Sequence, residues 1–154
     1  MPEFNIATME AYIKNFAEVI KTNPQIRDFK EIETRENYIL FYYAMNMGVM
    51  SDRDVVCELK MQKEANGDYT SIAQSIKHPD HPEVKGRIRM DFLKASRCRD
   101  IDGKLEILEF SNMDMKGYFP MKMMNMFMGS AIAKSIPELH KAMNKYKVEW
   151  ILFE

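Results

Sequence analysis

Hydrophobic positions near the start of the chain follow a helical period, which then gives way to strand patterns. Apolar residues recur every three or four positions between Thr8 and Lys21, which predicts an amphipathic helix with Thr8 as its cap. Residues 26–34 then predict a short strand and residues 37–48 a second one. Both faces of the second strand are apolar or aromatic, so we expect it to be covered on both sides.

Four further segments alternate apolar and polar residues with the period of two that is typical of strands. They span residues 53–62, 69–77, 84–94 and 104–113. Hairpin turn signals stand at residues 66–68 and 102–103, because Asn, Asp and Gly tolerate positive φ. The alternation slips near Leu108, which predicts a β-bulge in the last strand.

A second helix is predicted from Pro120 to about Tyr146, since proline is favoured in the first helical turn. Its apolar stripe contains Met121, Met124, Met128 and Ile132. Pro137 falls inside this range, so the helix either kinks or restarts there. The order of helix, about six antiparallel strands and long helix predicts an α+β fold. A curved sheet would grip the C-terminal helix, with room for an apolar cavity between them.

Composition narrows the class of protein. The 154 residues contain no linker, which predicts a single domain over residues 1–154. A net charge of -1 predicts no nucleic-acid partner, because binding would need a clustered basic surplus. The chain opens without a signal peptide and contains only Cys57 and Cys98, so we expect a reducing, cytoplasmic setting. Fifteen methionines suit either a loosely specified core or an adaptable ligand-binding surface.

Candidate catalytic chemistry is sparse. His78 and His81 flank prolines at a spacing that two metal ligands could share, but Asp80 is their sole acidic neighbour in this loop. No phosphate-binding glycine loop or nucleophile motif is present. An enzyme site would need Tyr42, Asp91 and His140 to converge in the cavity, and the sequence pattern does not indicate that they do. We therefore expect a binding protein rather than an enzyme, with no metal and no cofactor.

Three segments resemble one family, the steroidogenic acute regulatory protein-related lipid transfer (START) domains. Ser51–Val56 (SDRDVV) resembles the S-x-R-D-hydrophobic strand entry of that family. Ser75–Arg89 (SIKHPDHPEVKGRIR) is similar to its S-x-x-H-P-x-x-P and K-G-x-x-R segment. Asp114–Pro120 (DMKGYFP) is similar to its D-x-K-G-x-x-P entry to the closing helix, and Asn125 follows at the family's distance. The resemblance extends from Ala11 to about Tyr146.

The resemblance implies a helix-grip fold that holds one lipid in its cavity, with the closing helix as a movable lid. It also implies transient contact with a membrane. The motif residues themselves are expected to shape turns, a strand entry and a helix start. The expected lipid contacts are Tyr42, Val55, Cys57, Leu59, Ile88, Met90, Leu93, Met121, Met124 and Met128.

The lipid class follows from how this chain departs from the family. Sterol-handling members place an acidic and a basic side chain in the cavity, where this chain has Leu40 and Leu59. Pro137 resembles a proline of the phosphatidylcholine-transfer subgroup, but the positions matching its choline-binding aromatics are Tyr42, Val55 and Leu93. We therefore expect a phospholipid or other long-chain lipid held by apolar contact.

The first helix and first strands of the family have no counterpart in this sequence. The expected sheet then has an open edge, which invites pairing with another strand. Three explanations stand side by side: an abbreviated domain, a piece of a longer protein, or a homodimer that completes the sheet. The alternative function is an interaction or sensing module without transfer activity.

Overall fold

The computed structural model describes residues 4–118, 120, 125, 129 and 136–147. Two helices open the fold, α1 (Ile6–Lys14) and α2 (Phe16–Lys21), and a third helical run occupies residues 136–145. The strands are β1 (Ile26–Arg35), β2 (Tyr38–Met45), β3 (Asp52–Lys63), β4 (Tyr69–Ser75), β5 (Arg87–Arg89), β6 (Asp91–Ile101) and β7 (Lys104–Asp114). This order confirms the predicted α+β, helix-grip class.

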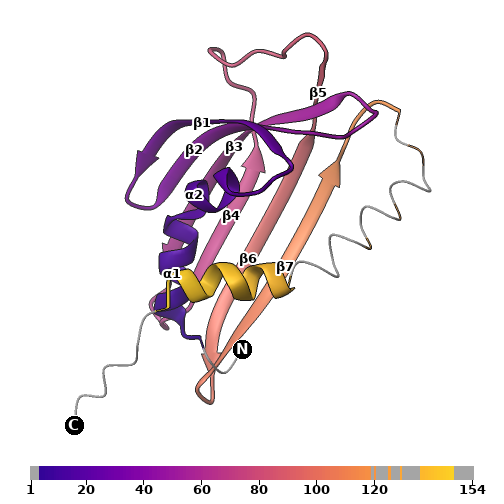
Figure 1. Ribbon diagram of the computed structural model, residues 1–154. Coiled ribbons are helices and arrows are strands. Elements are labelled where there is room, and N and C mark those ends of the chain that lie inside the picture. The colour runs from indigo at the N-terminus through magenta and orange to yellow at the C-terminus, as the bar shows by residue number, and fades with distance from the viewer. Residues whose placement is uncertain (1–3, 119, 121–124, 126–128, 130–135, 148–154) are drawn as a thin grey trace.

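The strands form one sheet in the order β1-β2-β3-β4-β6-β7 (Figure 1). Neighbours along this order are antiparallel, whereas the short β5 runs parallel to the start of β3. The helices α1, α2 and 136–145 lie over one face of the sheet (Figure 1). We call this face the inner face and the opposite one the outer face.

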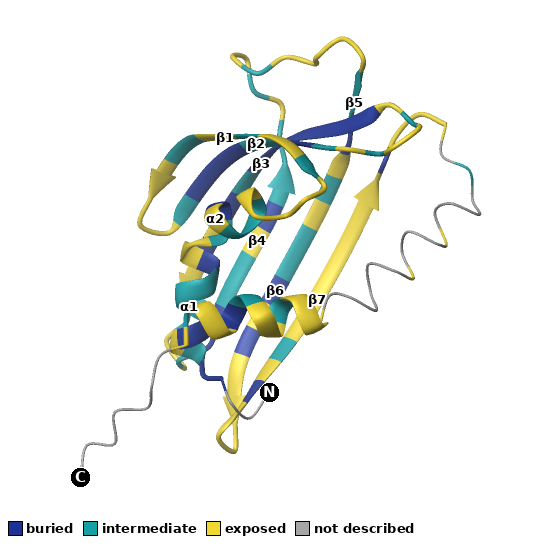
Figure 2. Cartoon of the chain, in the orientation of Figure 1, coloured by how far each residue is buried: buried dark blue, intermediate teal, exposed yellow. Residues whose placement is uncertain are grey.

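The inner face of β3 holds the centre of the core. The period of two predicts that its alternate apolar residues share one face, and those four are all buried: Val55, Cys57, Leu59 and Met61. Phe41 of β2 lies opposite Cys57 and is also fully buried. Burial is dense in β2 and β3 and sparse in β7 (Figure 2).

The first helix begins earlier than predicted. Asn5, not Thr8, is its cap: Asn5 Oδ1 accepts a hydrogen bond from the Thr8 backbone N–H at 2.8 Å. Thr8 is buried inside α1 and its hydroxyl donates to the same oxygen at 2.9 Å. Asn and Thr are both favoured at this position, and the two apolar residues between Asn5 and Thr8 are too few to show where the helix begins. A break at Asn15, which the pattern does not predict, separates α1 from α2.

Residues 84–94 do not form the single strand that the pattern predicts. Arg87–Arg89 pairs with the start of β3, and the Met90 backbone N–H donates to the Asp54 carbonyl at 3.0 Å. The chain changes neighbour after Met90, and β6 begins at Asp91 beside β4. The alternation alone could not show this change of partner.

The bulge predicted near Leu108 is also wrong. β6 and β7 pair without a register shift from one end of the hairpin to the other. The alternation slips because Leu108 and Phe110 are apolar residues that point to the exposed outer face, not because a residue is inserted. The turn before β7 is as predicted, with φ of 53° at Asp102 and 71° at Gly103.

Candidate functional site

A cavity of about 740 Å³ lies between the helices and the inner face of the sheet. Its helical wall comes from α1, α2 and the run 136–145 and is largely apolar, although Glu138 also lines the cavity. The apolar residues of this wall are Met9, Tyr12, Ile13, Phe16, Val19, Ile20, Ile136, Leu139 and Ala142. The sheet contributes Leu59, Ala73, Leu105 and Ile107. This volume and lining are typical of a site for an apolar ligand of small-molecule size.

One row of polar side chains interrupts the sheet wall of the cavity. Ser71 of β4 and Ser96 of β6 share a hydrogen bond of 2.7 Å, and Glu109 of β7 lies opposite Ser96 in the strand register. Lys94 of β6 forms an ion pair with Glu109 at 2.9 Å. We call these four residues the polar row. They give a largely apolar cavity one place where a polar group of a ligand can be hydrogen-bonded.

Tyr12 of α1 stands on the helical side of the same cavity. Burial, and to a smaller extent the nearby carboxylate of Glu109, raises the pKa of its phenol to about 12. The phenol is therefore neutral at physiological pH and available as a hydrogen-bond donor. Tyr12 thus adds a polar group to the helical wall of the cavity.

Of the residues predicted to contact lipid, Leu59 lines the cavity. Val55 and Met90 are fully buried against each other in a separate small cluster, and Cys57 lies in the main core. Ile88 packs close to Gly117, where an added Cβ would stand 2.9 Å from the Ile88 Cδ1. Met121, Met124 and Met128 lie outside the described residues.

Tyr42 and Leu93 point to the outer face, away from the cavity. Tyr42 pairs with Val56 in the register, so its side chain lies opposite to that of Val55. Its hydroxyl donates to Asp54 Oδ2 at 3.1 Å and accepts from Arg87 at 2.6 Å. The three positions matched to a choline site, Tyr42, Val55 and Leu93, therefore do not converge.

Leu40 and Leu59 also lie on opposite faces, because Leu40 pairs with Glu58. The charged pair in the cavity wall is instead Lys94 and Glu109, on β6 and β7. The sequence pattern did not reveal this pair, because the fifth predicted strand, residues 84–94, ended at Lys94. If the predicted strand is continued by two residues, Lys94 and Ser96 fall on the same face as Phe92, because residues two positions apart in a strand share a face.

The family-like motifs form two structural clamps. Arg53 donates to the carbonyls of Ser51, Met115 and Lys116 at 2.7, 3.1 and 3.1 Å, which ties the start of β3 to the segment after β7. Gly117, with φ of 63°, lets that segment approach Ile88.

The second clamp joins β3 to the proline loop on the outer face. Arg89 forms a two-point contact with the buried Asp54 at 2.8 and 3.2 Å, and it also donates to the carbonyls of His81 and Pro82. The His81 ring stacks on Tyr42 at 6.0 Å. These contacts match the expectation that the motif residues shape the fold, and they lie away from the cavity.

The structure offers no support for a metal at the histidine pair. The rings of His78 and His81 are 5.3 Å apart, yet no group of three histidine, cysteine or acidic residues gathers within the described part of the chain. Burial raises the pKa of the Cys98 thiol to about 11 and that of Cys57 still further. Among the helices that the structure describes, none combines the length and apolar character that crossing a bilayer requires.

One curated protein and two solved structures are similar to this chain. Mouse StAR-related lipid transfer protein 5 is 28% identical over 104 residues, which cover 65% of this chain and 49% of that protein. The crystal structure of human STARD10 superposes with a TM-score of 0.79 at 20% identity, covering 94% of this chain and 60% of that one. Human StAR-related lipid transfer protein 5 gives a TM-score of 0.67 at 20% identity, covering 82% and 64%.

The chain spans about half the length of the curated relative that it matches. The superpositions show that the sheet and its helices share the fold of these solved structures. The family model of the START domain matches residues 14–149, which is most of the sequence. The chain belongs to the START domain family.

Proposed function

We propose that this chain binds one lipid in the cavity between its helices and its sheet, and carries that lipid between membranes without catalysis. The observation that carries the proposal is the cavity of about 740 Å³ with its largely apolar helical wall. Apolar chains leave water favourably when they enter such a space. The relatives are named as lipid transfer proteins, which fits the same activity.

The ligand we favour is a phospholipid or another long-chain lipid with one polar end. The helical wall and Leu59 would hold the chains, and the polar row with Tyr12 would hold the polar end. A purely apolar ligand would leave Lys94 and Glu109 facing hydrocarbon, which is unfavourable for charged groups. Of the other predicted contacts, Met121, Met124 and Met128 remain part of the proposal.

Residues 136–145 supply the movable part of the site. Ile136, Leu139 and Ala142 line the cavity from this helical run, whereas the sheet side is a continuous hydrogen-bonded ladder. Displacement of a helix breaks apolar contacts but no ladder, so it is the less costly way to open the site. Transient contact of these apolar residues with a membrane would accompany loading.

Native mass spectrometry of the purified chain, followed by lipid extraction, tests the proposal. We expect one lipid per chain, or uptake of one lipid after incubation with mixed liposomes. Ala73→Phe should reduce uptake, because Ala73 lines the cavity and a phenyl ring would fill it. Ala95→Phe is the matched control, since Ala95 lies opposite Ile72 on the outer face. A chain that stays empty, or equal uptake by both variants, would overturn the proposal.

One observation favours a second function, that of an interaction module. β7 has a neighbour on one side, β6, and no second neighbour among the described strands. Such a module would complete its sheet with another strand and would need no lipid. A chain that forms a complex yet carries no lipid would favour this reading.

A further inference from the structure

Tyr69 of β4 carries a buried hydroxyl that has no hydrogen-bond partner. The residue is 1% exposed, and among the described residues its hydroxyl oxygen is the sole buried side-chain polar atom without a partner. Buried polar groups in native proteins are almost always hydrogen-bonded, because an unpaired one bears the full cost of its desolvation. The protein alone leaves this donor unsatisfied, so a group from outside the chain is its natural partner.

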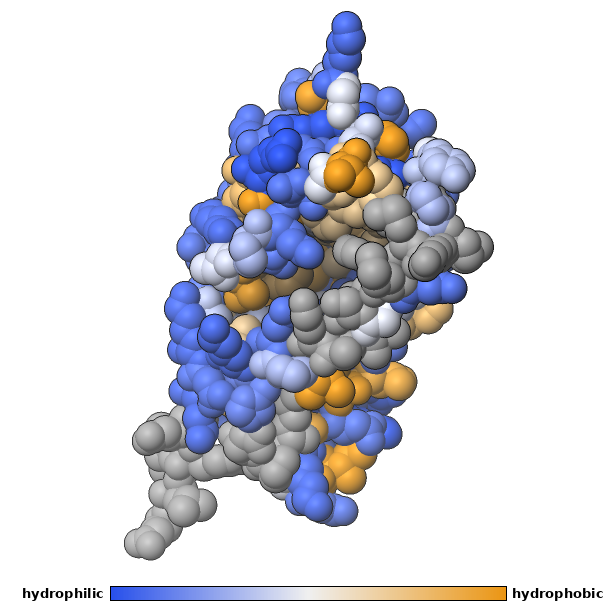
Figure 3. Space-filling model, turned by 45° about the vertical axis from the view of Figure 1, so that its right-hand side comes forward, coloured by the Kyte–Doolittle hydropathy of each residue, from blue (hydrophilic) through white to orange (hydrophobic). Residues whose placement is uncertain are grey.

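Tyr69 lies on the inner face, beside the floor of the cavity. It shares that face with Ser71 and Ala73, which both line the cavity, because residues two positions apart in a strand point the same way. Ser71 belongs to the polar row, and Tyr69 stands about 7 Å further along β4. Figure 3 shows an apolar recess near the centre of the molecule, bordered by hydrophilic side chains. The part of a ligand that adjoins its polar end is therefore the part nearest to Tyr69.

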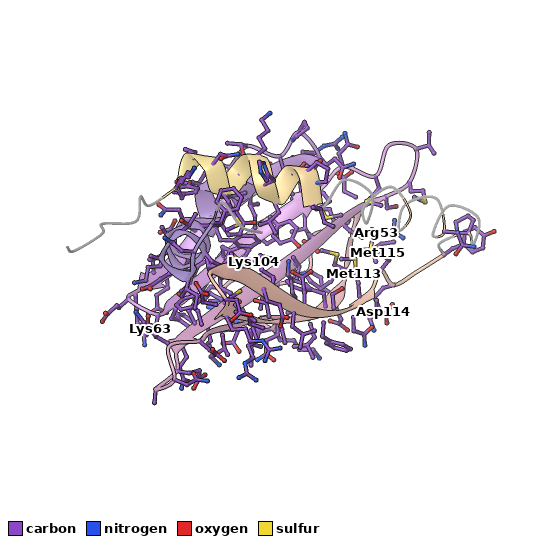
Figure 4. The ribbon with its side chains drawn as sticks, turned by 90° about the horizontal axis from the view of Figure 1, so that it is seen from below. Arg53, Lys63, Lys104, Met113, Asp114 and Met115 are labelled. Atoms are coloured by element: carbon purple, nitrogen blue, oxygen red, sulfur yellow. The ribbon has the colours of Figure 1, made fainter. Side chains whose placement is uncertain are left out.

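The end of the sheet that holds Tyr69 lies under α1. Tyr69 pairs with Lys63 in the strand register. Figure 4 shows Lys63 and Lys104 at one end of the sheet and Arg53 at the other. Met9 of α1 belongs to the same buried cluster as Tyr69 and also lines the cavity. A methionine side chain is unbranched and flexible, so we expect Met9 to be the side chain that moves aside when a ligand reaches the hydroxyl.

The surroundings of the hydroxyl favour an uncharged acceptor. Burial, and to a smaller extent the nearby carboxylate of Glu10, raises the pKa of the Tyr69 phenol to about 12. The phenol is therefore a proton donor at physiological pH. The negative potential of Glu10 disfavours a phosphate or carboxylate oxygen at this place, whereas an uncharged carbonyl oxygen remains a good acceptor.

We propose that the Tyr69 hydroxyl donates a hydrogen bond to an ester carbonyl of the bound lipid, which makes this chain selective for acyl-ester lipids over alkyl-ether lipids. The inference rests on the proposed function, because it assigns a role to Tyr69 in the same cavity. In a glycerophospholipid the ester carbonyls lie between the polar head and the chains, so a head group at the polar row would place them next to Tyr69. An ether analogue has a methylene group at that place and would leave the hydroxyl unpaired.

Competition between two matched lipids tests the proposal. The probes are dioleoyl phosphatidylcholine and its dioleyl ether analogue, which differ in the two carbonyl groups. Liposomes that contain both lipids in equal amounts are incubated with the chain, and native mass spectrometry measures the ratio of the two complexes. The parent chain should favour the ester on the order of tenfold, as expected for one buried hydrogen bond. Tyr69→Phe should bring the ratio close to one.

Tyr42→Phe is the matched control. The Tyr42 hydroxyl is paired with Asp54 and Arg87 on the outer face, so this variant should keep the ester preference. The two variants should also differ in the absence of lipid. Y69F removes an unpaired polar atom and should keep or raise the midpoint of thermal unfolding, whereas Y42F removes a paired one and should lower it.

Uptake and selectivity distinguish two ways in which the proposal can fail. A parent chain that takes up neither lipid would contradict the proposed function and this inference together. Uptake of both lipids without preference, or a Y69F variant that keeps the ester preference, would overturn the role of Tyr69 alone. A marked fall in the unfolding midpoint of lipid-free Y69F would show that the hydroxyl already has a partner, and would overturn that role as well.

Discussion

The two halves of the sheet have similar apolar residues but differ in how deeply these residues are buried. In β2 and β3, Phe41 and Val55 are fully inaccessible on the inner face, and Val56 is equally buried on the outer face. In β7, Leu105 is buried at the start of the strand and most later residues are exposed. β7 is nevertheless also rich in apolar residues.

The difference lies in what surrounds each strand. The inner face of β2 and β3 is covered by α1 and α2, and the outer face by the proline loop that Arg89 and His81 tie to Asp54 and Tyr42. Among the described strands, β7 has β6 on one side and no strand on the other. Alternation therefore indicates a strand but does not tell which faces are covered.

The largest expected difference in stability is between substitutions of two phenylalanines, Phe41 and Phe110. Phe41→Ala should lower the free energy of unfolding by about 4 kcal/mol, because Phe41 is fully buried and the substitution leaves a cavity. Phe110→Ala should lower it by less than about 1 kcal/mol, since Phe110 is exposed. Denaturant unfolding at low protein concentration measures both. Comparable losses would show that the outer face of β7 is already covered within one chain.

A smaller contrast is expected between two carboxylates. Asp54→Ala should cost about 3 kcal/mol of unfolding free energy, because it leaves Arg89 and Tyr42 without their buried partner. Glu106→Ala removes an exposed partner of Arg99 and should cost about 0.5 kcal/mol. Thermal and denaturant unfolding of both variants would check the contrast. A small loss for D54A would mean that the outer clamp contributes little to the β2–β3 half.

Much of the fold could be predicted because the period of two is strong in these strands. The pattern correctly grouped Val55, Cys57, Leu59 and Met61 on one face. It failed at Met90, where hydrogen bonds to β3 divide a continuous alternation into two strands. Such a change of partner depends on long-range contacts and leaves no local signal.

The candidate site could be predicted less well than the fold. Alternation defines two faces of a strand, but it does not say which face meets the helices. Tyr42 and Leu93 therefore came out on the face away from the cavity. Lys94 and Glu109 were missed because charged residues in a strand are usually read as outward-facing. Their inner position depends on the register, which is a property of the whole sheet.

The polar row should matter for ligand choice rather than for stability. The variant K94M/E109Q keeps side-chain size but removes both charges, and it should weaken uptake of a phospholipid about tenfold, as expected for lost hydrogen bonds to charged groups. The affinity for a purely apolar probe should not fall. Liposome-based uptake assays with both ligands measure the difference.

The control for this variant is an ion pair on the outer face of β6. R97M/D68N removes the charges of Arg97 and Asp68, which pair at 2.7 Å and are not among the residues that line the cavity. It should leave both affinities unchanged. Equal weakening by the two double variants would mean that the loss of any ion pair on β6, and not the loss of the polar row, controls uptake.

Substitution of Tyr12 should have the smallest effect on stability at neutral pH, and a larger effect at alkaline pH. Its folded pKa of about 12 lies above the ordinary value of 10.0, mainly because of burial, so the folded state holds the phenolic proton more tightly. The stabilisation is complete below the unfolded pKa and is lost as the pH rises through the folded pKa. Tyr12→Phe should therefore flatten the fall in stability between about pH 10 and pH 12. Tyr43 and Tyr69 also have raised pKa values and should leave a residual slope. An unchanged slope would mean that the Tyr12 phenol is hydrated, and that the cavity between α1 and β7 is open to water at this point.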